Sequence, residues 1–375
     1  MAYIAYNQRG KKRLWSYTIR EGNKSLDYRS GFKTKKEAKL VAESVLHRIN
    51  TGSVLRPDMT LPELYQEWLD LKILPSDKSQ QTKDKYLMRK KTVIRLFGSK
   101  PVSKIRASEY QRIMNSYGQS VSRNHLGRLN SNISACIKMA IADKVFLEDF
   151  TTSVELFSSK QGQDSSEKYL HTELDYVTVL GYLKEKWDYH KSIVPYVIYF
   201  LFKTGMRYSE LIALTWQDID YNREMISTYR RYNTLIHKFT PPKNKSSIRK
   251  VPITRELVDV LKSLKIYQTR ANKELGITNP DNMIFQHFAY KNGVPDISTV
   301  NKAMKSMLLE LDIRPLITTK GARHTFGSYL WHNDIDLGVI AKVLGHKDIS
   351  MLVEVYGHTL EEKISEEFEV IKSFI

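Results

Sequence analysis

The sequence predicts a multidomain protein in which a small basic β-sheet-plus-helix module precedes an all-α domain and a mixed, mainly α-helical domain with a small antiparallel sheet. Three observations lead to this fold class. The length of 375 residues exceeds that of one ordinary domain, positive charge is concentrated at the N-terminus, and helical periodicity dominates the remainder except for one β-rich stretch. Hydrophobic residues make up 41% of the chain, so extensive disorder is excluded.

The charge balance restricts the kind of partner. The chain carries 59 Lys and Arg against 41 Asp and Glu, a net charge of +18, which indicates a polyanionic partner such as nucleic acid or an acidic membrane surface, or else a solvated basic surface without a partner. The longest apolar stretch, residues 193–202, contains Pro195 and is about half as long as a bilayer span, so it predicts a buried helix. The N-terminal residues contain no apolar core long enough for a signal peptide, and the single Cys136 cannot form an internal disulfide, so we expect a cytoplasmic protein.

Residues 1–52 form the predicted basic module. They contain twelve Lys and Arg against four Asp and Glu, a net charge of +8. Residues 15–20 alternate apolar with polar side chains, and turn residues follow at 22–23 and 30–31, as in short antiparallel strands. A helix is expected from Thr34 onward, with one apolar face formed by Ala38, Val41, Ala42 and Val45.

The second predicted domain, residues 58–157, is helical and follows a linker at 53–60. Two apolar stripes at helical spacing support it: Leu61, Leu64, Tyr65 and Trp68 behind Thr60 as N-cap, and Leu126, Leu129, Ile133, Cys136, Ile137 and Ala140. The second stripe makes Cys136 a core residue. Between the stripes lies a basic run that forms either a solvated helix face or a phosphate-tracking one: Lys83, Lys85, Arg89, Lys90 and Lys91.

The third predicted domain, residues 167–375, follows a polar linker at 158–166. It begins with helices, passes through short strands at 225–229, 235–239 and 249–253, and returns to helices. No internal repeat is evident.

Polar motifs of this third domain carry the candidate chemistry. Arg207 follows a glycine turn in the segment 204–211, where it is suited to binding an oxyanion. Lys243 lies between two predicted strands, where a β-hairpin turn would hold it at the tip, and Lys245 is its rival. Towards the C-terminus come the segments Thr-Lys-Gly-Ala-Arg-His at 319–324, Leu-Gly-His at 344–346 and Val-Tyr-Gly-His at 355–358.

In this order, the motifs resemble those of the tyrosine recombinase family, also called the phage integrase family. The resemblance covers essentially the whole chain and is greatest to the lambda-type integrases of temperate phages and conjugative transposons. It aligns Arg207, Lys243, Arg323, His346 and Tyr356 with the family's first arginine, hairpin lysine, second arginine, second histidine and nucleophile.

The resemblance implies an arm-type DNA-binding module at 1–52, a core-binding domain at 58–157 and a catalytic domain at 167–375. It implies that Tyr356 cleaves double-stranded DNA through a 3′-phosphotyrosyl intermediate, with the arginines and His346 stabilising the transition state and Lys243 protonating the leaving group. The expected substrates are core-type and arm-type attachment sites of a mobile element, bound by a homo-tetramer. The resemblance also implies an excisionase and a DNA-bending protein as accessory partners, and neither ATP, a metal nor another cofactor.

Lys320 departs from the family pattern, which has histidine three residues before the second arginine. A lysine donates to phosphate, but an ammonium with the ordinary pKa of about 10.4 does not accept the tyrosine proton at neutral pH. The general base is therefore open, unless neighbouring charges and burial lower the pKa of Lys320.

Three other interpretations have less support in the sequence. The histidines at 324, 332, 346 and 358 fit no compact zinc motif. A chromosome-dimer resolvase of the same family would lack the N-terminal module. A catalytically impaired DNA-binding regulator is favoured by Lys320 alone.

Overall fold

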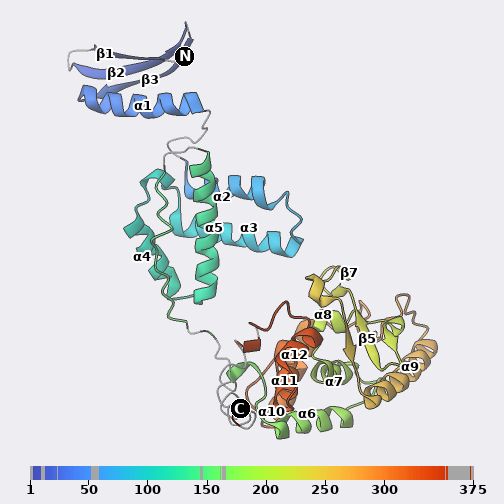
Figure 1. The fold of residues 1–375 in the computed structure, drawn as a ribbon. Helices are drawn as coiled ribbons and strands as arrows, with labels where there is room; N and C mark the ends of the chain where they lie inside the picture. The colour runs from blue at the N-terminus through green and yellow to red at the C-terminus, as the bar shows by residue number, and fades with distance from the viewer. Residues whose placement is uncertain are drawn as a thin grey trace. The chain divides into compact units, whose positions relative to one another are not determined.

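A computed structural model describes residues 3–9, 13–22, 24–51, 59–143, 147–160, 162, 166–350, 352–353 and 372. The chain divides into two compact units, residues 1–162 and 163–375, and each is described by itself (Figure 1). No helix in the described residues is long and apolar enough to cross a membrane.

The N-terminal part of the first unit is a three-stranded antiparallel sheet covered on one face by a helix (Figure 1). Its elements are β1 (Tyr3–Arg9), β2 (Leu14–Glu21), β3 (Lys24–Phe32) and α1 (Lys35–Thr51). Tyr17 and Ile19, two residues apart on β2, are buried together with Ala42 of α1. Thr18 lies between them and therefore faces the opposite side of the sheet, where it pairs with the exposed Tyr28. The predicted strands and helix are thus confirmed, whereas the turn expected at 30–31 is a bulge within β3, where Gly31 adopts a φ of 102°.

The rest of the first unit is helical. Its elements are α2 (Leu61–Trp68), the π-helical turn η1 (Leu69–Ile73), α3 (Gln80–Phe97), η2 (Val102–Lys104), α4 (Ala107–Gly118) and α5 (Arg123–Ala142). Thr60 caps α2 in a reciprocal pair with Glu63, as expected for a capping box. Both predicted apolar stripes are buried in one core, and the Cys136 thiol donates to the Asn132 carbonyl at 3.0 Å. Cys136 is therefore a core residue.

The second unit combines helices with two small antiparallel sheets. Its helices are η3 (Ser166–Lys168), α6 (Glu173–Glu185), α7 (Val194–Thr204), α8 (Tyr208–Leu211), η4 (Trp216–Asp218), η5 (Lys245–Ser247), α9 (Arg255–Leu275), α10 (Ile297–Glu310), α11 (Thr319–His332) and α12 (Leu337–Leu344). Its strands are β4 (Ile219–Asp220), β5 (Met225–Thr228) and β8 (Arg249–Pro252) in one sheet, and β6 (Arg231–Asn233) and β7 (Lys238–Thr240) in the other.

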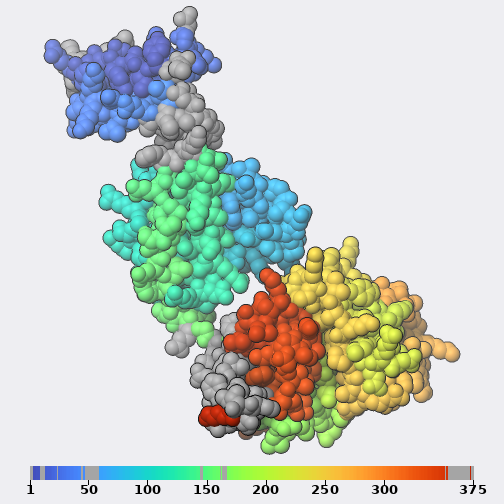
Figure 2. Space-filling model, viewed as in Figure 1, coloured from blue at the N-terminus to red at the C-terminus, as the bar shows by residue number. Residues whose placement is uncertain are grey.

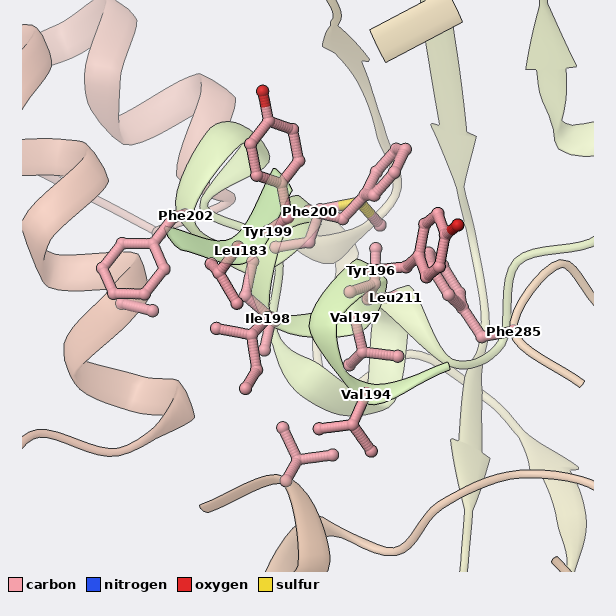
Figure 3. Packing of buried hydrophobic residues seen from close by; sticks show 14 of the residues in the cluster. Leu183, Val194, Tyr196, Val197, Ile198, Tyr199, Phe200, Phe202, Leu211 and Phe285 are labelled. Atoms are coloured by element: carbon pink, nitrogen blue, oxygen red, sulfur yellow. The ribbon is translucent and has the colours of Figure 1, made fainter. Parts of the chain in front are cut away.

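Helix α7 forms the centre of the second unit. It is the predicted buried helix, with Pro195 in its first turn, where a missing N–H costs nothing. Its side chains project in several directions into the surrounding core, including Tyr199, Phe200 and Phe202 (Figure 3). Because α7 is packed against α6, α10 and α11, its C-terminal end is held rigidly.

The β-rich stretch differs from the prediction in two respects. The strand expected at 235–239 begins only at Lys238, because residues 234–237 form the turn of the β6–β7 hairpin and His237 adopts a left-handed conformation with φ of 51°. In addition, β7 and β8 belong to different sheets. The segment that carries Lys243 is therefore a connection between two sheets and not a β-hairpin turn.

Candidate active site

Arg207 is placed by the turn that ends α7. Gly205 adopts a left-handed conformation with φ of 59°, and a Cβ there would lie 2.4 Å from the Phe326 ring and 2.6 Å from Leu344. Glycine is required for both reasons. The chain then reverses, and Arg207 becomes the N-cap of α8.

Glu210 holds Arg207 in place. Its carboxylate, 1% exposed, accepts from Arg207 Nη1 at 2.7 Å and from Arg249 Nη2 at 3.1 Å, so it lies between two guanidinium groups. Burial raises the pKa of Glu210, but Arg249 and Arg207 outweigh it and lower the pKa overall. Arg207 also donates to Ser247 Oγ at 3.4 Å and, through Nη2, to the Gly345 carbonyl at 3.2 Å.

Arg323 lies on α11 and reaches the corner that the chain forms at Leu344 and Gly345, at the end of α12. It is 5% exposed, and it donates to the Gly205 carbonyl at 2.9 Å and to the Leu344 carbonyl. The two arginines thus bind adjacent carbonyl groups at the end of α12. The structure brings them together from segments more than a hundred residues apart.

His346 follows that corner directly. Gly345, with φ of 68°, ends α12, and the His346 N–H returns to the Ala341 carbonyl at 2.9 Å. The imidazole is 8% exposed, and its buried Nδ1 has no hydrogen-bond partner among the described residues. Burial, followed by the charges of Arg323 and Arg207, lowers the pKa of His346 to about 4. The ring is therefore neutral at pH 7 in the protein without DNA.

The connection between β7 and β8 is hydrogen-bonded to this corner. Ser246 Oγ donates to the Gly345 carbonyl at 3.3 Å, and Asn244 caps η5 by accepting from the Ser247 N–H at 3.1 Å. The yellow β5–β8 region and the orange-red C-terminal helices accordingly form adjoining parts of the surface (Figure 2). Lys243 and Lys245 are both exposed on this connection, and both remain candidates for the proton donor.

Lys320 occupies the second position of α11, one turn before the buried His324. Its side chain is exposed, so the partial burial that would have added to the effect of neighbouring charges is absent. Burial, Lys320 and Arg323 together lower the pKa of His324 to about 3. Lys320 therefore lies close enough to His324 to act on it electrostatically.

Tyr356 and His358 lie outside the described residues. The segment that leads towards them begins a helical turn at Ser350, whose N–H donates to Asp348 at 3.0 Å. Leu352 is fully buried, whereas Ile349 and Val353 are partly exposed. Ser350, Leu352 and Val353 are helical, in line with the predicted return to helices in this domain.

Sequence reasoning missed Glu210 and Arg249. Arg207 and Glu210 are three residues apart at the start of a helix, a spacing typical of a capping pair. This spacing could have indicated that Glu210 contacts Arg207. Arg249 could not be found in this way, because only the tertiary fold brings it to Glu210, 39 residues away in the chain.

The arrangement is suited to binding a tetrahedral oxyanion. Two guanidinium groups, a neutral imidazole and exposed lysines surround one corner, and their donors match the oxygens of a phosphodiester. Among the described residues, no three His, Cys, Asp or Glu side chains are placed to share a metal ion.

Comparison with known proteins agrees with this chemistry. The sequence profile of the phage integrase family matches residues 172–363. The chain is 25% identical over 360 residues to the tyrosine recombinase XerC-like protein of Caldanaerobacter subterraneus subsp. tengcongensis, covering 90% of each chain. It is 26% identical over 351 residues to the integrase of Staphylococcus phage L54a, covering 87% of this chain and 96% of that relative.

Among solved structures, the integrase of transposon Tn1549 in complex with transposon right-end DNA is similar with a TM-score of 0.67 at 20% identity. The match covers 84% of this chain and all of that one. The two proteins share a fold, which confirms the predicted fold class.

Proposed function

The chain belongs to the phage integrase family of site-specific DNA recombinases, and we propose that Arg207, Arg323 and Tyr356 are central to the site with which it cuts and rejoins DNA. It is an enzyme of the tyrosine recombinase type. The observation that supports the site assignment is that Arg207 and Arg323 donate to the adjacent carbonyl groups of Gly345 and Leu344, directly before His346.

In the proposed reaction, the Tyr356 oxygen attacks the scissile phosphorus, and the bond from phosphorus to the DNA 5′-oxygen breaks. Charge grows on the non-bridging oxygens during this step, so two arginines and His346 stabilise the transition state more than the bound substrate. Lys243 supplies the proton to the departing 5′-oxygen, the proton of the Tyr356 hydroxyl passes to water or to another group near Tyr356, and a 3′-phosphotyrosyl bond remains. The reverse attack by another 5′-hydroxyl rejoins DNA without ATP, because one phosphodiester replaces another.

A nicked suicide substrate tests this proposal. Loss of the short downstream fragment prevents religation, so the wild-type enzyme should accumulate as a covalent DNA adduct. Tyr356→Phe removes only the nucleophilic oxygen and should bind DNA normally while forming no adduct. An adduct with this variant would refute the assignment of Tyr356. A wild-type chain that binds but never forms the adduct would instead favour a catalytically impaired regulator.

We assign residues 1–52 to arm-type sites and residues 58–157 to the core-type site, with 167–375 as the catalytic domain. The sheet face opposite α1 supports the first assignment, since it carries Tyr28 and Thr18 in a module of net charge +8. A two- or three-stranded sheet can enter the major groove of DNA. This module also argues against a chromosome-dimer resolvase.

We also assign the enzyme to a homo-tetrameric synapse in the bacterial cytoplasm, where it integrates a mobile element and, with an excisionase and a DNA-bending protein, excises it. The sequence of the tail 360–375 supports assembly, because it combines an apolar helical stripe with five glutamates, which disfavour DNA contact. Truncation after His358 should weaken cooperative binding to paired sites and leave monomer binding intact. Unchanged cooperativity would place the tail on its own catalytic domain.

A further inference from the structure

The segment through which the chain enters the second unit is attached to α11 on both sides of Arg323. A Cβ at Gly321 would lie 2.8 Å from the Lys168 carbonyl oxygen, so the backbones touch there. Two residues further along the segment, the Leu170 N–H donates to Thr325 Oγ1 at 3.0 Å. Gly321 and Thr325 each lie two residues from Arg323.

Tyr169, between these two attachments, is 1% exposed and belongs to a buried cluster with Ile340, Ala341, Leu344 and Leu352. The ring therefore packs where α11, α12 and the segment after His346 meet. The Leu344 carbonyl is the acceptor of Arg323, and Leu352 lies four residues before Tyr356.

Three groups of the proposed site thus bond to, or follow closely, the end of α12, where Leu344 of the Tyr169 cluster lies. Arg323 is held by the Leu344 carbonyl, and His346 follows Leu344 by two residues. The next carbonyl, that of Gly345, accepts from Arg207. Removing the ring would leave a void in the cluster that contains Leu344 and Leu352, and neighbouring residues would shift towards it.

We propose that Tyr169 is a positioning residue for strand cleavage, which holds the α11–α12 corner and the start of the nucleophile segment in register. The proposal rests on the assignment of Arg323, His346 and Tyr356 given above. Tyr169 touches no DNA in this role, and its effect is on the alignment of the groups that do. A misplacement of about 1 Å can lower a rate on the order of a hundredfold.

The test is single-turnover adduct formation by the full chain on the suicide substrate, with the rate constant and the end point measured separately. Tyr169→Ala should lower the rate constant at least tenfold while DNA affinity and the end point stay at wild-type values. Tyr169→Phe keeps the ring and should restore the rate to within about threefold. Tyr189→Ala is the matched control, because Tyr189 is an equally buried tyrosine packed against His287, outside this cluster, and it should leave the rate constant unchanged.

A second pair of variants avoids the large void. Thr325→Val removes the acceptor of the Leu170 N–H and should also lower the rate constant, whereas Thr325→Ser retains the hydroxyl and should not. A wild-type rate constant in both Tyr169→Ala and Thr325→Val would overturn the proposal. So would a loss confined to the end point, because that reports fewer folded molecules. Adduct formation by Tyr356→Phe would refute the site assignment independently.

Discussion

The lowered pKa of His346 makes the stability of the second unit dependent on pH in a defined direction. The folded protein holds the pKa of this imidazole at about 4, against 6.5 for the unperturbed group. Between these values the unfolded chain binds a proton that the folded protein does not, so stability falls as pH falls below 6.5. From pH 7 to pH 5, the two pKa values correspond to a loss of about 2 kcal/mol.

Urea unfolding followed by tryptophan fluorescence at pH 7 and pH 5 measures this loss. Other groups, such as His324 and the buried Glu210, also respond to acid, so the informative quantity is the difference between the wild type and His346→Asn. The variant should lose about 2 kcal/mol less than the wild type between the two pH values. His237→Asn, at an exposed histidine of the same unit, should keep the wild-type dependence. The same pH dependence in His346→Asn and the wild type would refute the reasoning.

The remaining predictions concern the groups around this histidine and the N-terminal module. Glu210→Gln leaves two guanidinium groups without their shared counter-charge and should cost about 3–5 kcal/mol in unfolding free energy, together with most of the cleavage rate; unchanged stability would contradict the pairing. A substrate with sulfur at the bridging 5′ position needs no proton for its leaving group. It should therefore restore cleavage to the variant that lacks the proton donor, either Lys243→Ala or Lys245→Ala, and it should not increase cleavage by the other variant. Lys320→Met should slow cleavage without removing a step from the pH–rate profile, as expected of an exposed phosphate contact; loss of such a step would instead make the lysine a base. Deletion of residues 1–52 should abolish binding to a distal arm-type site while sparing cleavage at the core site, and an isolated 1–52 fragment with no DNA affinity at low salt would count against the module.

The sequence predicted the elements whose apolar periodicity is long enough to be unambiguous. The stripe from Leu126 to Ala140 and the apolar run of α7 are buried as expected, because burial of one face or of a whole helix leaves a repeated pattern. Short apolar runs carry no such pattern. Leu235 and Ile236 favoured a strand, yet they lie exposed in a hairpin turn.

For the site, family motifs identified Arg207, Arg323 and His346, which the structure places at one corner. Their supports were not predictable, because a carbonyl acceptor such as Leu344 has no sequence signature and Arg249 reaches Glu210 only through the fold. The exposure of Lys320 likewise depends on what packs against α11. Local patterns therefore indicate the candidate groups, whereas the contacts that orient them depend on the tertiary structure.

The attachment of residues 168–170 to α11 affects where this protein can be divided in engineering. Recombinases with new target sites can be built by joining the DNA-binding part of one chain to the catalytic part of another. A junction placed at Gly162 would keep Tyr169 and Leu170 in the same chain as the native helices α11 and α12, on which they pack. A junction placed at His171, just before α6, would replace residues 168–170 by those of another protein, in the cluster that contains Leu344. We expect chimaeras of the second kind to bind their new sites and cut them slowly.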